Sequence, residues 1–139
     1  EARAVLYGMT RTTRRPEIVK AGLESIVYQT TDVLTAMEQA SGIAIEELRV
    51  DGGPTRNGYL MQFQSDMAQI PVQVPSSEEL SGIGAAYAAG LVAGIYQMET
   101  LFDGQERTKF VPSMLREDRE QKYRGWRKAV TKALSFDKL

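Results

Sequence analysis

The residues best suited to bind a ligand stand in one short stretch, residues 48–58, where two glycines precede an asparagine. Backbone N–H groups at Gly52 and Gly53 can approach a phosphate closely because no Cβ intervenes. The side-chain amide of Asn57 both donates and accepts hydrogen bonds, so it can meet a purine, a ribose or a phosphate oxygen. Paired glycines after a strand can also serve the turn alone, so this stretch by itself leaves both interpretations open.

The flanking residues predict a strand, a glycine turn and a helix. Residues 48–51 alternate apolar with charged side chains and include a β-branched valine, which is typical of a short strand. After the glycines, apolar residues recur at helical spacing from Leu60 to Met67, and we expect this helix to end near Ala68. The start of the helix adds the positive end of its dipole to the turn, which favours an anionic ligand.

This stretch resembles the glycerol kinases of the FGGY family of ATP-dependent carbohydrate kinases. Their run reads close to L-R-V-D-G-G, then an asparagine, then L-M-Q-F-Q-S-D, and residues 48–53, Asn57 and residues 60–66 match it. The resemblance implies phosphoryl transfer from ATP to glycerol, or to another polyol or ketose, with Mg²⁺ accompanying the nucleotide. It also implies that Gly53 and Asn57 contact ATP, with Gly52 as the adjoining turn glycine. Arg56 could also contact a phosphate, although we favour an exposed side chain that takes no part in binding.

Further segments carry the same resemblance. Residues 4–24 follow a family signature that ends in A-small-L-E, except that Gly22 stands where the family usually has serine, threonine or alanine. The pattern at residues 84–91 matches one that these kinases carry next to the nucleotide site. Residues 110–126 match F-x-P-S-M followed by Y-x-x-W.

The resemblance spans residues 4 to about 134 and implies an α/β fold, part of an actin-like, ribonuclease H-like ATPase domain with an incomplete sheet flanked by helices. Residues 1–139 would form the second half of the C-terminal nucleotide-binding domain, and the N-terminal substrate domain would be absent. The polyol pocket and the catalytic base belong to absent segments, so we assign no catalytic residue and no metal ligand here. We expect the isolated chain to be inactive, and we expect its partners to be glycerol or a related polyol, the remainder of the kinase chain and further copies in a homo-oligomer.

Composition excludes several other classes of protein. The chain has 139 residues, a net charge of −1, and neither cysteine nor histidine. Disulfides, cysteine or histidine metal sites and triads that use either residue are therefore excluded. The charge gives no reason to expect nucleic acid or a membrane surface as a partner. Lack of cysteine fits a reducing compartment, so we predict a cytoplasmic protein. The sequence starts without a methionine or a signal-peptide pattern, so we expect a chain that begins partway through a longer one.

The remaining pattern predicts four more elements. A helix begins at Pro16 and Glu17 and ends near residues 41–42, and Gly22 inside it indicates close packing. Residues 70–75 form a strand framed by prolines, which suits an edge or the start of a strand better than a central position. Residues 76–79 have the spacing of a capping box. Residues 80–97 carry no charge, and we expect a helix buried against the sheet rather than a membrane span.

The C-terminal part is predicted as a polar excursion over residues 99–111 and a last helix from about Arg116. Ser113 is the candidate cap of this helix. Its buried stripe is predicted from the helical spacing of Tyr123, Trp126, Val130, Ala133 and Leu134. We expect two or three strands in all.

Two alternatives remain. The loop with Arg11, Arg14 and Arg15 could bind a phosphate, although we favour a solvated approach to the following helix. The chain could also act as an assembly module that pairs with a partner chain carrying the catalytic half, because its amphipathic helices would leave apolar surface exposed.

Overall fold

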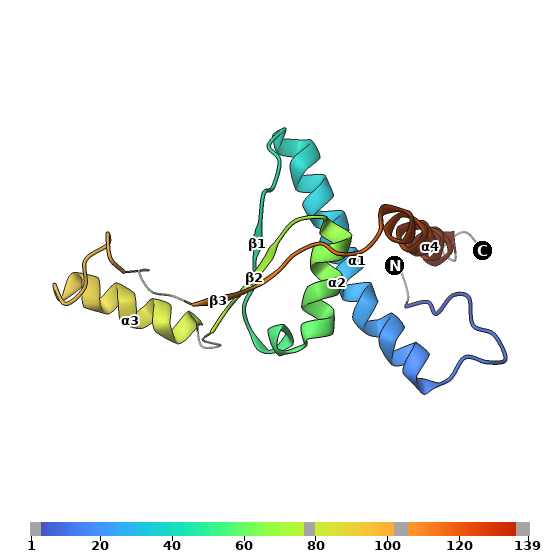
Figure 1. Ribbon diagram of the computed structural model, residues 1–139, viewed down its shortest axis with the longest axis horizontal. Coiled ribbons are helices and arrows are strands. Elements are labelled where there is room, and N and C mark those ends of the chain that lie inside the picture. The colour runs from blue at the N-terminus through green and yellow to red at the C-terminus, as the bar shows by residue number, and fades with distance from the viewer. Residues whose placement is uncertain (1–3, 77–79, 102–105, 136–139) are drawn as a thin grey trace.

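The computed structural model describes residues 4–76, 80–101 and 106–135. The elements follow in the order α1 (Arg15–Ser41), β1 (Leu48–Arg49), the short 3₁₀-helix η1 (Gly53–Arg56), α2 (Gly58–Ala68), β2 (Val72–Pro75), α3 (Leu80–Val92), β3 (Arg107–Phe110) and α4 (Arg116–Ser135). Helix α2 packs against the sheet and against α1, while α4 contacts both α1 and α2 (Figure 1). This is the α/β arrangement with a small sheet that the sequence predicts.

The sheet has the order β1-β2-β3, with β1 and β2 parallel and β2 and β3 antiparallel. Strand β2 is the central strand, so the expectation of an edge is wrong, whereas Pro71 does stand at the start of the strand, the other position that the sequence favours. Its prolines are tolerated because Pro71 precedes the strand, where its carbonyl accepts the N–H of Leu48 at 2.9 Å. Pro75 ends the strand beyond the part that pairs with β1. Strand β3 lies within the segment predicted as a polar excursion.

Helix α1 begins and ends as predicted. The Glu17 carboxylate accepts the N–H of Arg14 at 2.8 Å, and Gly42 closes the helix with a φ of 69°. The expected close packing at Gly22 is not found among the described residues. Gly22 is exposed, and a Cβ placed there would meet no atom within 4 Å.

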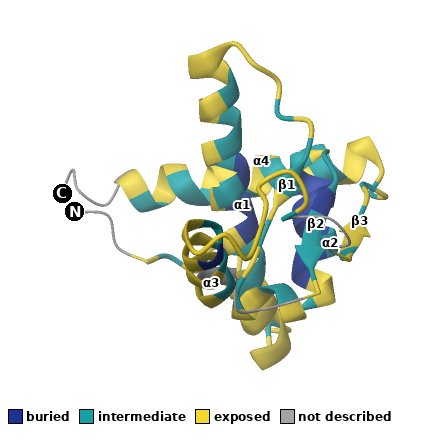
Figure 2. Cartoon of the chain, turned by 90° about the vertical axis from the view of Figure 1, so that its left-hand side faces the viewer, coloured by how far each residue is buried: buried dark blue, intermediate teal, exposed yellow. Residues whose placement is uncertain are grey.

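The core lies between α1, α2 and β2. Its fully buried centre includes Val27, Met67 and Val72. Buried residues are dark blue in Figure 2. Tyr28 connects this centre to α4, since its ring lies edge-on to Phe63 and stacks on Trp126 with centroids 5.4 Å apart. The core therefore fixes α2, which follows the glycine turn.

Helix α3 departs most from expectation. It ends at Val92 and extends away from the sheet, at the far left of Figure 1, so the predicted burial against the sheet is wrong. Most of its described side chains are exposed. Tyr96, just beyond the helix, packs on it at Tyr87 and Gly90. No described helix or strand makes extensive contact with α3, which is why most of it stays exposed. The predicted capping box includes residues 77–79 and lies outside the described residues.

Helix α4 is held by two carboxylates. Asp32 on α1 accepts hydrogen bonds from the Tyr123 hydroxyl and, at 2.7 Å, from the indole N–H of Trp126. Asp66 on α2 accepts the N–H of Ser113 at 2.7 Å. The predicted cap at Ser113 is therefore wrong, because the residue before the helix is Leu115 and Ser113 bonds α2 instead.

The stripe that α4 buries is partly as predicted. Four of its five predicted residues are at least half-buried, but Leu134 is 58% exposed and that part of the prediction is wrong. None of the helices in the described parts of the chain is long and apolar enough to cross a membrane.

Candidate functional site

The glycine turn links the end of β1 to the start of α2, as predicted, with η1 inserted between them. Gly52 has a φ of 89° and a ψ of 175°, a backbone conformation that in practice only glycine adopts. Gly53 is exposed, and a Cβ there would meet no atom within 4 Å. Gly52 is therefore needed for the shape of the turn. Gly53 has open space beside its backbone, because it has no Cβ and no described atom lies there.

Thr55 fixes the turn internally, a role that the sequence analysis missed. Both its N–H, at 3.0 Å, and its hydroxyl, at 2.7 Å, donate to the carbonyl oxygen of Gly52. A threonine three residues after a turn glycine is the signal that could have indicated this contact, because its hydroxyl commonly bonds nearby backbone. Arg56 follows and is exposed, as the favoured expectation has it, and a phosphate contact from it stays the alternative.

Asn57 is the N-cap of α2. Its side-chain Oδ1 accepts the N–H of Leu60 at 3.2 Å, and its own N–H donates to the carbonyl of Pro54 at 3.1 Å. Because the cap engages Oδ1, the group that Asn57 can offer to a ligand is its Nδ2 donor. The structure thus brings Gly52, Gly53 and Asn57 together in one turn.

A second contact between helices supports the start of α2. The Tyr59 hydroxyl donates to Glu24 Oε1 on α1 at 2.6 Å, and Lys20 Nζ lies 3.7 Å from the same oxygen. Partial burial, and then the hydrogen bond to Glu24, raise the pKa of Tyr59 above its ordinary value. Tyr59 therefore remains a protonated donor, and its contact holds the first turn of α2 against α1.

The other end of α2 is held by Asp66, which is only 6% exposed. Its Oδ1 accepts the N–H groups of Ser113 at 2.7 Å and Met114 at 3.0 Å, together with Gln62 Nε2 at 3.1 Å. Ser65 Oγ donates to the carbonyl of Ile70 at 2.8 Å. The polar residues of this helix thus position the segments around α2, and they do not point to chemistry of their own.

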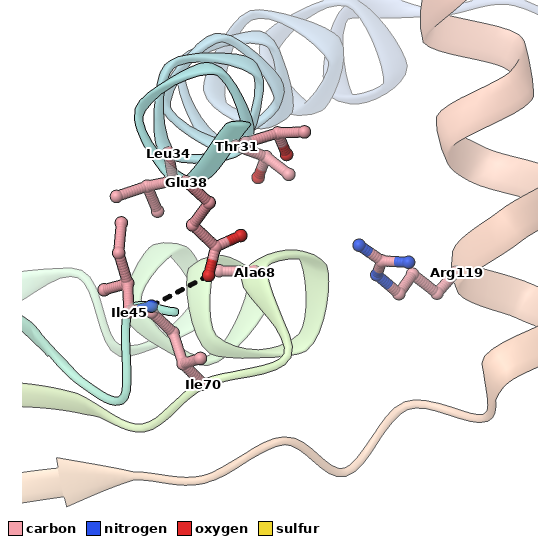
Figure 3. Close-up of a pocket in the computed structure, with 8 residues that line it drawn as sticks. Thr31, Leu34, Glu38, Ile45, Ala68, Ile70 and Arg119 are labelled. Atoms are coloured by element: carbon pink, nitrogen blue, oxygen red, sulfur yellow. Dashed lines mark hydrogen bonds between the residues drawn. The ribbon is translucent and has the colours of Figure 1, made fainter. Parts of the chain in front are cut away.

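A small cavity of about 70 Å³ lies between α1, α2 and α4 (Figure 3). On one side the Glu38 carboxylate accepts the N–H of Ile45 at 2.8 Å, and on the other Arg119 Nε donates to the carbonyl of Met67 at 2.8 Å. The cavity reaches Ala68 at the C-terminal end of α2, whereas the glycine turn precedes its N-terminal end. The 11 residues between them span about 16 Å, so the cavity is not part of the turn.

The other candidates add little. Arg11 and Arg14 are exposed, and Arg15 is the first residue of α1, which agrees with a solvated approach to that helix. Among the described residues, no group of three or more acidic side chains could hold a metal ion.

The sequence model of the C-terminal domain of the FGGY family of carbohydrate kinases matches residues 1–93. The chain belongs to this family. It is 47% identical over 138 residues to a glycerol kinase of Geobacillus sp. (strain WCH70), an alignment that covers 98% of this chain and 28% of the relative. The chain thus spans just over a quarter of the length of this relative.

Solved structures agree with the family assignment. A Plasmodium falciparum glycerol kinase with ADP is 35% identical to this chain and has a TM-score of 0.83. The match covers 96% of this chain and 27% of the length of that kinase. A xylulose kinase from Rhodospirillum rubrum has a TM-score of 0.73 at 22% identity and shows the shared fold. The match covers 93% of this chain and 27% of the length of that kinase. The predicted actin-like fold and the resemblance to glycerol kinases are confirmed.

Proposed function

We propose that the chain is part of an ATP-dependent glycerol kinase, which transfers the γ-phosphoryl group of ATP to a terminal hydroxyl of glycerol and releases ADP. The observation that carries this proposal is the 47% identity to a glycerol kinase over 98% of the chain. Identity to a xylulose kinase of the same fold is 22%, so glycerol is favoured over a ketose as the acceptor.

In this proposal the glycine turn contributes part of the ATP site. The exposed backbone at Gly53 lets the nucleotide approach without a Cβ in the way, and Gly52 gives the turn its shape. Asn57 offers its Nδ2 donor to the nucleotide while Oδ1 stays in the helix cap. Tyr59 and Glu24 keep the first turn of α2 in place beneath these contacts.

The rest of the reaction depends on residues outside this chain. Residues 1–139 form the second half of the C-terminal domain in this proposal, and the polyol pocket and the catalytic base lie in the remainder of the kinase. The described residues offer no acidic cluster for Mg²⁺, so the ion would be held by the ATP phosphates and by other segments. The bound ion would neutralise phosphate charge. A cytoplasmic homo-oligomer belongs to the same proposal.

A chimeric kinase tests the proposal. In it, this chain replaces the matching segment of the Geobacillus sp. glycerol kinase, and ADP release is measured with ATP and glycerol, and with ATP without an acceptor. We expect glycerol-dependent release of ADP. A chimera that folds, with a melting temperature near that of its parent, but releases no ADP with glycerol would overturn the proposal.

The isolated chain is expected to show no turnover, because positioning an acceptor in line with the phosphoryl group needs the missing parts. The same assay on the purified chain checks this. ADP and glycerol phosphate formed above a blank without protein would contradict it.

A further inference from the structure

The asparagine of the glycine turn stands in a chemically labile position in the sequence. Asn57 is followed directly by Gly58, and it is the only asparagine of the chain. In such a pair the backbone nitrogen of the glycine can attack the side-chain amide carbon of the asparagine, and glycine has no Cβ to crowd that attack. The pair is therefore prone to spontaneous loss of the side-chain amide group, and the structure decides when this can occur.

Both reacting groups are accessible. Gly58 is exposed, and a Cβ placed there would meet no described atom within 4 Å. As the first residue of α2, Gly58 has no carbonyl of the same helix to accept its N–H. Asn57 is half-buried between the exposed residues Arg56 and Gly58, so water reaches the turn. The attacking nitrogen is thus not engaged within the helix, and the water that completes the reaction has access.

The geometry of the intact turn nevertheless opposes the reaction. Asn57 has a ψ of 95°, which directs the nitrogen of Gly58 away from the Cβ of Asn57. A ring can close only when that nitrogen and the side-chain carbon lie on the same side, so the peptide between the two residues must first rotate. The helix cap also holds the side chain, because Asn57 Oδ1 accepts the N–H of Leu60 at 3.2 Å. The folded turn therefore protects Asn57.

Tyr59 keeps the first turn of α2 closed. Its hydroxyl donates to Glu24 Oε1 on α1 at 2.6 Å, and its ring stacks on Phe63 with centroids 5.9 Å apart. The end of a helix opens locally at a lower free energy than the core of a protein does. The contact from Tyr59 to α1 therefore controls how often the backbone at Asn57 is free to rotate.

We propose that Asn57 is a site of spontaneous modification, at which the Asn-Gly pair deamidates whenever the start of α2 opens. The Gly58 nitrogen forms a bond to Cγ of Asn57, the bond from Cγ to Nδ2 breaks, and ammonia leaves with the proton of the Gly58 N–H. Water then opens the resulting succinimide ring at either of its carbonyl carbons, which gives aspartate or isoaspartate. No oxidant, reductant or enzyme takes part.

Either product changes the glycine turn. Both lose the Nδ2 donor and gain a negative charge, which the positive end of the α2 dipole favours but a phosphate group repels. Isoaspartate also routes the backbone through the side-chain carbon, which lengthens the chain between the turn and α2. The modification itself goes beyond the proposed function, whereas its effect on ATP binding rests on that function.

Peptide mass mapping of the chimeric kinase tests the proposal, with digestion at mildly acidic pH so that no deamidation occurs during preparation. The chimera is incubated at mildly alkaline pH, in native buffer and in urea, and the mass gain from exchange of the amide for a carboxyl group is followed at Asn57. We expect this gain under both conditions, at least tenfold faster in urea. In urea, Gly58→Ala should slow the gain about tenfold, because its Cβ crowds the attacking nitrogen.

Two further variants separate the chemistry from the fold. Tyr59→Phe removes the bond to Glu24, so deamidation in native buffer should become several-fold faster while the rate in urea stays unchanged. Gly125→Ala should change neither rate, and it is the matched control because Gly125 is exposed on α4 with no described atom near its Cβ position. The proposal is overturned by the absence of a mass gain at Asn57 in urea, by equal rates in native buffer and urea, or by an unchanged native rate in Tyr59→Phe.

Activity distinguishes this proposal from the proposed function. If Asn57 contacts ATP, the KM for ATP of the incubated chimera should rise in step with the deamidated fraction at Asn57. Gly58→Ala controls for other asparagines of the chimera, because its own initial KM should persist for longer. Deamidation at Asn57 with an unchanged KM would support the modification site while contradicting the proposed ATP contact. An active chimera that shows no mass gain at Asn57 in urea would do the reverse.

Discussion

Replacing Gly52 and Gly53 by alanine, one at a time, separates the shape of the glycine turn from access to it. Gly52 has a φ of 89° and a ψ of 175°, where a residue with a Cβ is strained by about 1–3 kcal/mol. Gly52→Ala should therefore disfavour the observed turn by roughly 5-fold to 150-fold, because each 1.4 kcal/mol is a factor of about ten. Both the melting temperature and kcat/KM for ATP of the chimeric kinase should fall.

Gly53→Ala should behave differently. A Cβ at this position meets no atom of the described residues within 4 Å, so the melting temperature should stay unchanged or rise slightly. If ATP approaches the turn at Gly53, the added methyl group should still raise KM for ATP at least several-fold. The assay is steady-state ADP release over a range of ATP concentrations, with Gly125→Ala as a distant control. An unchanged KM in Gly53→Ala would refute the proposed approach of the nucleotide.

Three further results are expected. Asn57→Asp keeps an acceptor for the helix cap but loses the Nδ2 donor. The melting temperature of the chimera should therefore stay unchanged while its KM for ATP rises. A drop in melting temperature would contradict the assignment of Oδ1 to the cap. Asp66→Ala leaves the partly buried N–H groups of Ser113 and Met114 without their acceptor and should cost about 3 kcal/mol in urea unfolding of the chain, whereas a loss below about 1 kcal/mol would contradict this role. Burial, and then the charge of Glu24, raise the pKa of Tyr28 to about 12 from 10.0, so the folded state favours the neutral phenol. Stability is then complete below pH 10 and declines as the pH rises from 10 to 12, and Tyr28→Phe should weaken this decline in urea unfolding.

Local patterns were sufficient for the parts of the fold that this chain completes by itself. The spacing from Leu60 to Met67 predicts α2, and Gly42 ends α1 as its type suggests. The position of the candidate site could also be predicted, because strand, glycine pair and asparagine are consecutive in sequence. The cap made by Asn57 was missed, although asparagine before a helix is a common cap.

The errors concern residues whose environment is set by distant segments. Strand β3 alternates charged and polar residues with only Phe110 apolar, and such a strand is recognised only once β2 lies beside it. Ser113 looks like a cap by spacing, but Asp66, 47 residues earlier, accepts its N–H. Helix α3 was predicted to be buried because it has no charge, yet no described element covers it.

The single tryptophan of the chain gives an optical reporter of how α4 is attached. Trp126 stacks on Tyr28 and donates its indole N–H to Asp32, so its emission depends on α1 and α4 remaining together. Helix α3 has no tryptophan. Fluorescence of Trp126 can therefore follow the loosening of α4 independently of events at α3, with no dye attached to the chain.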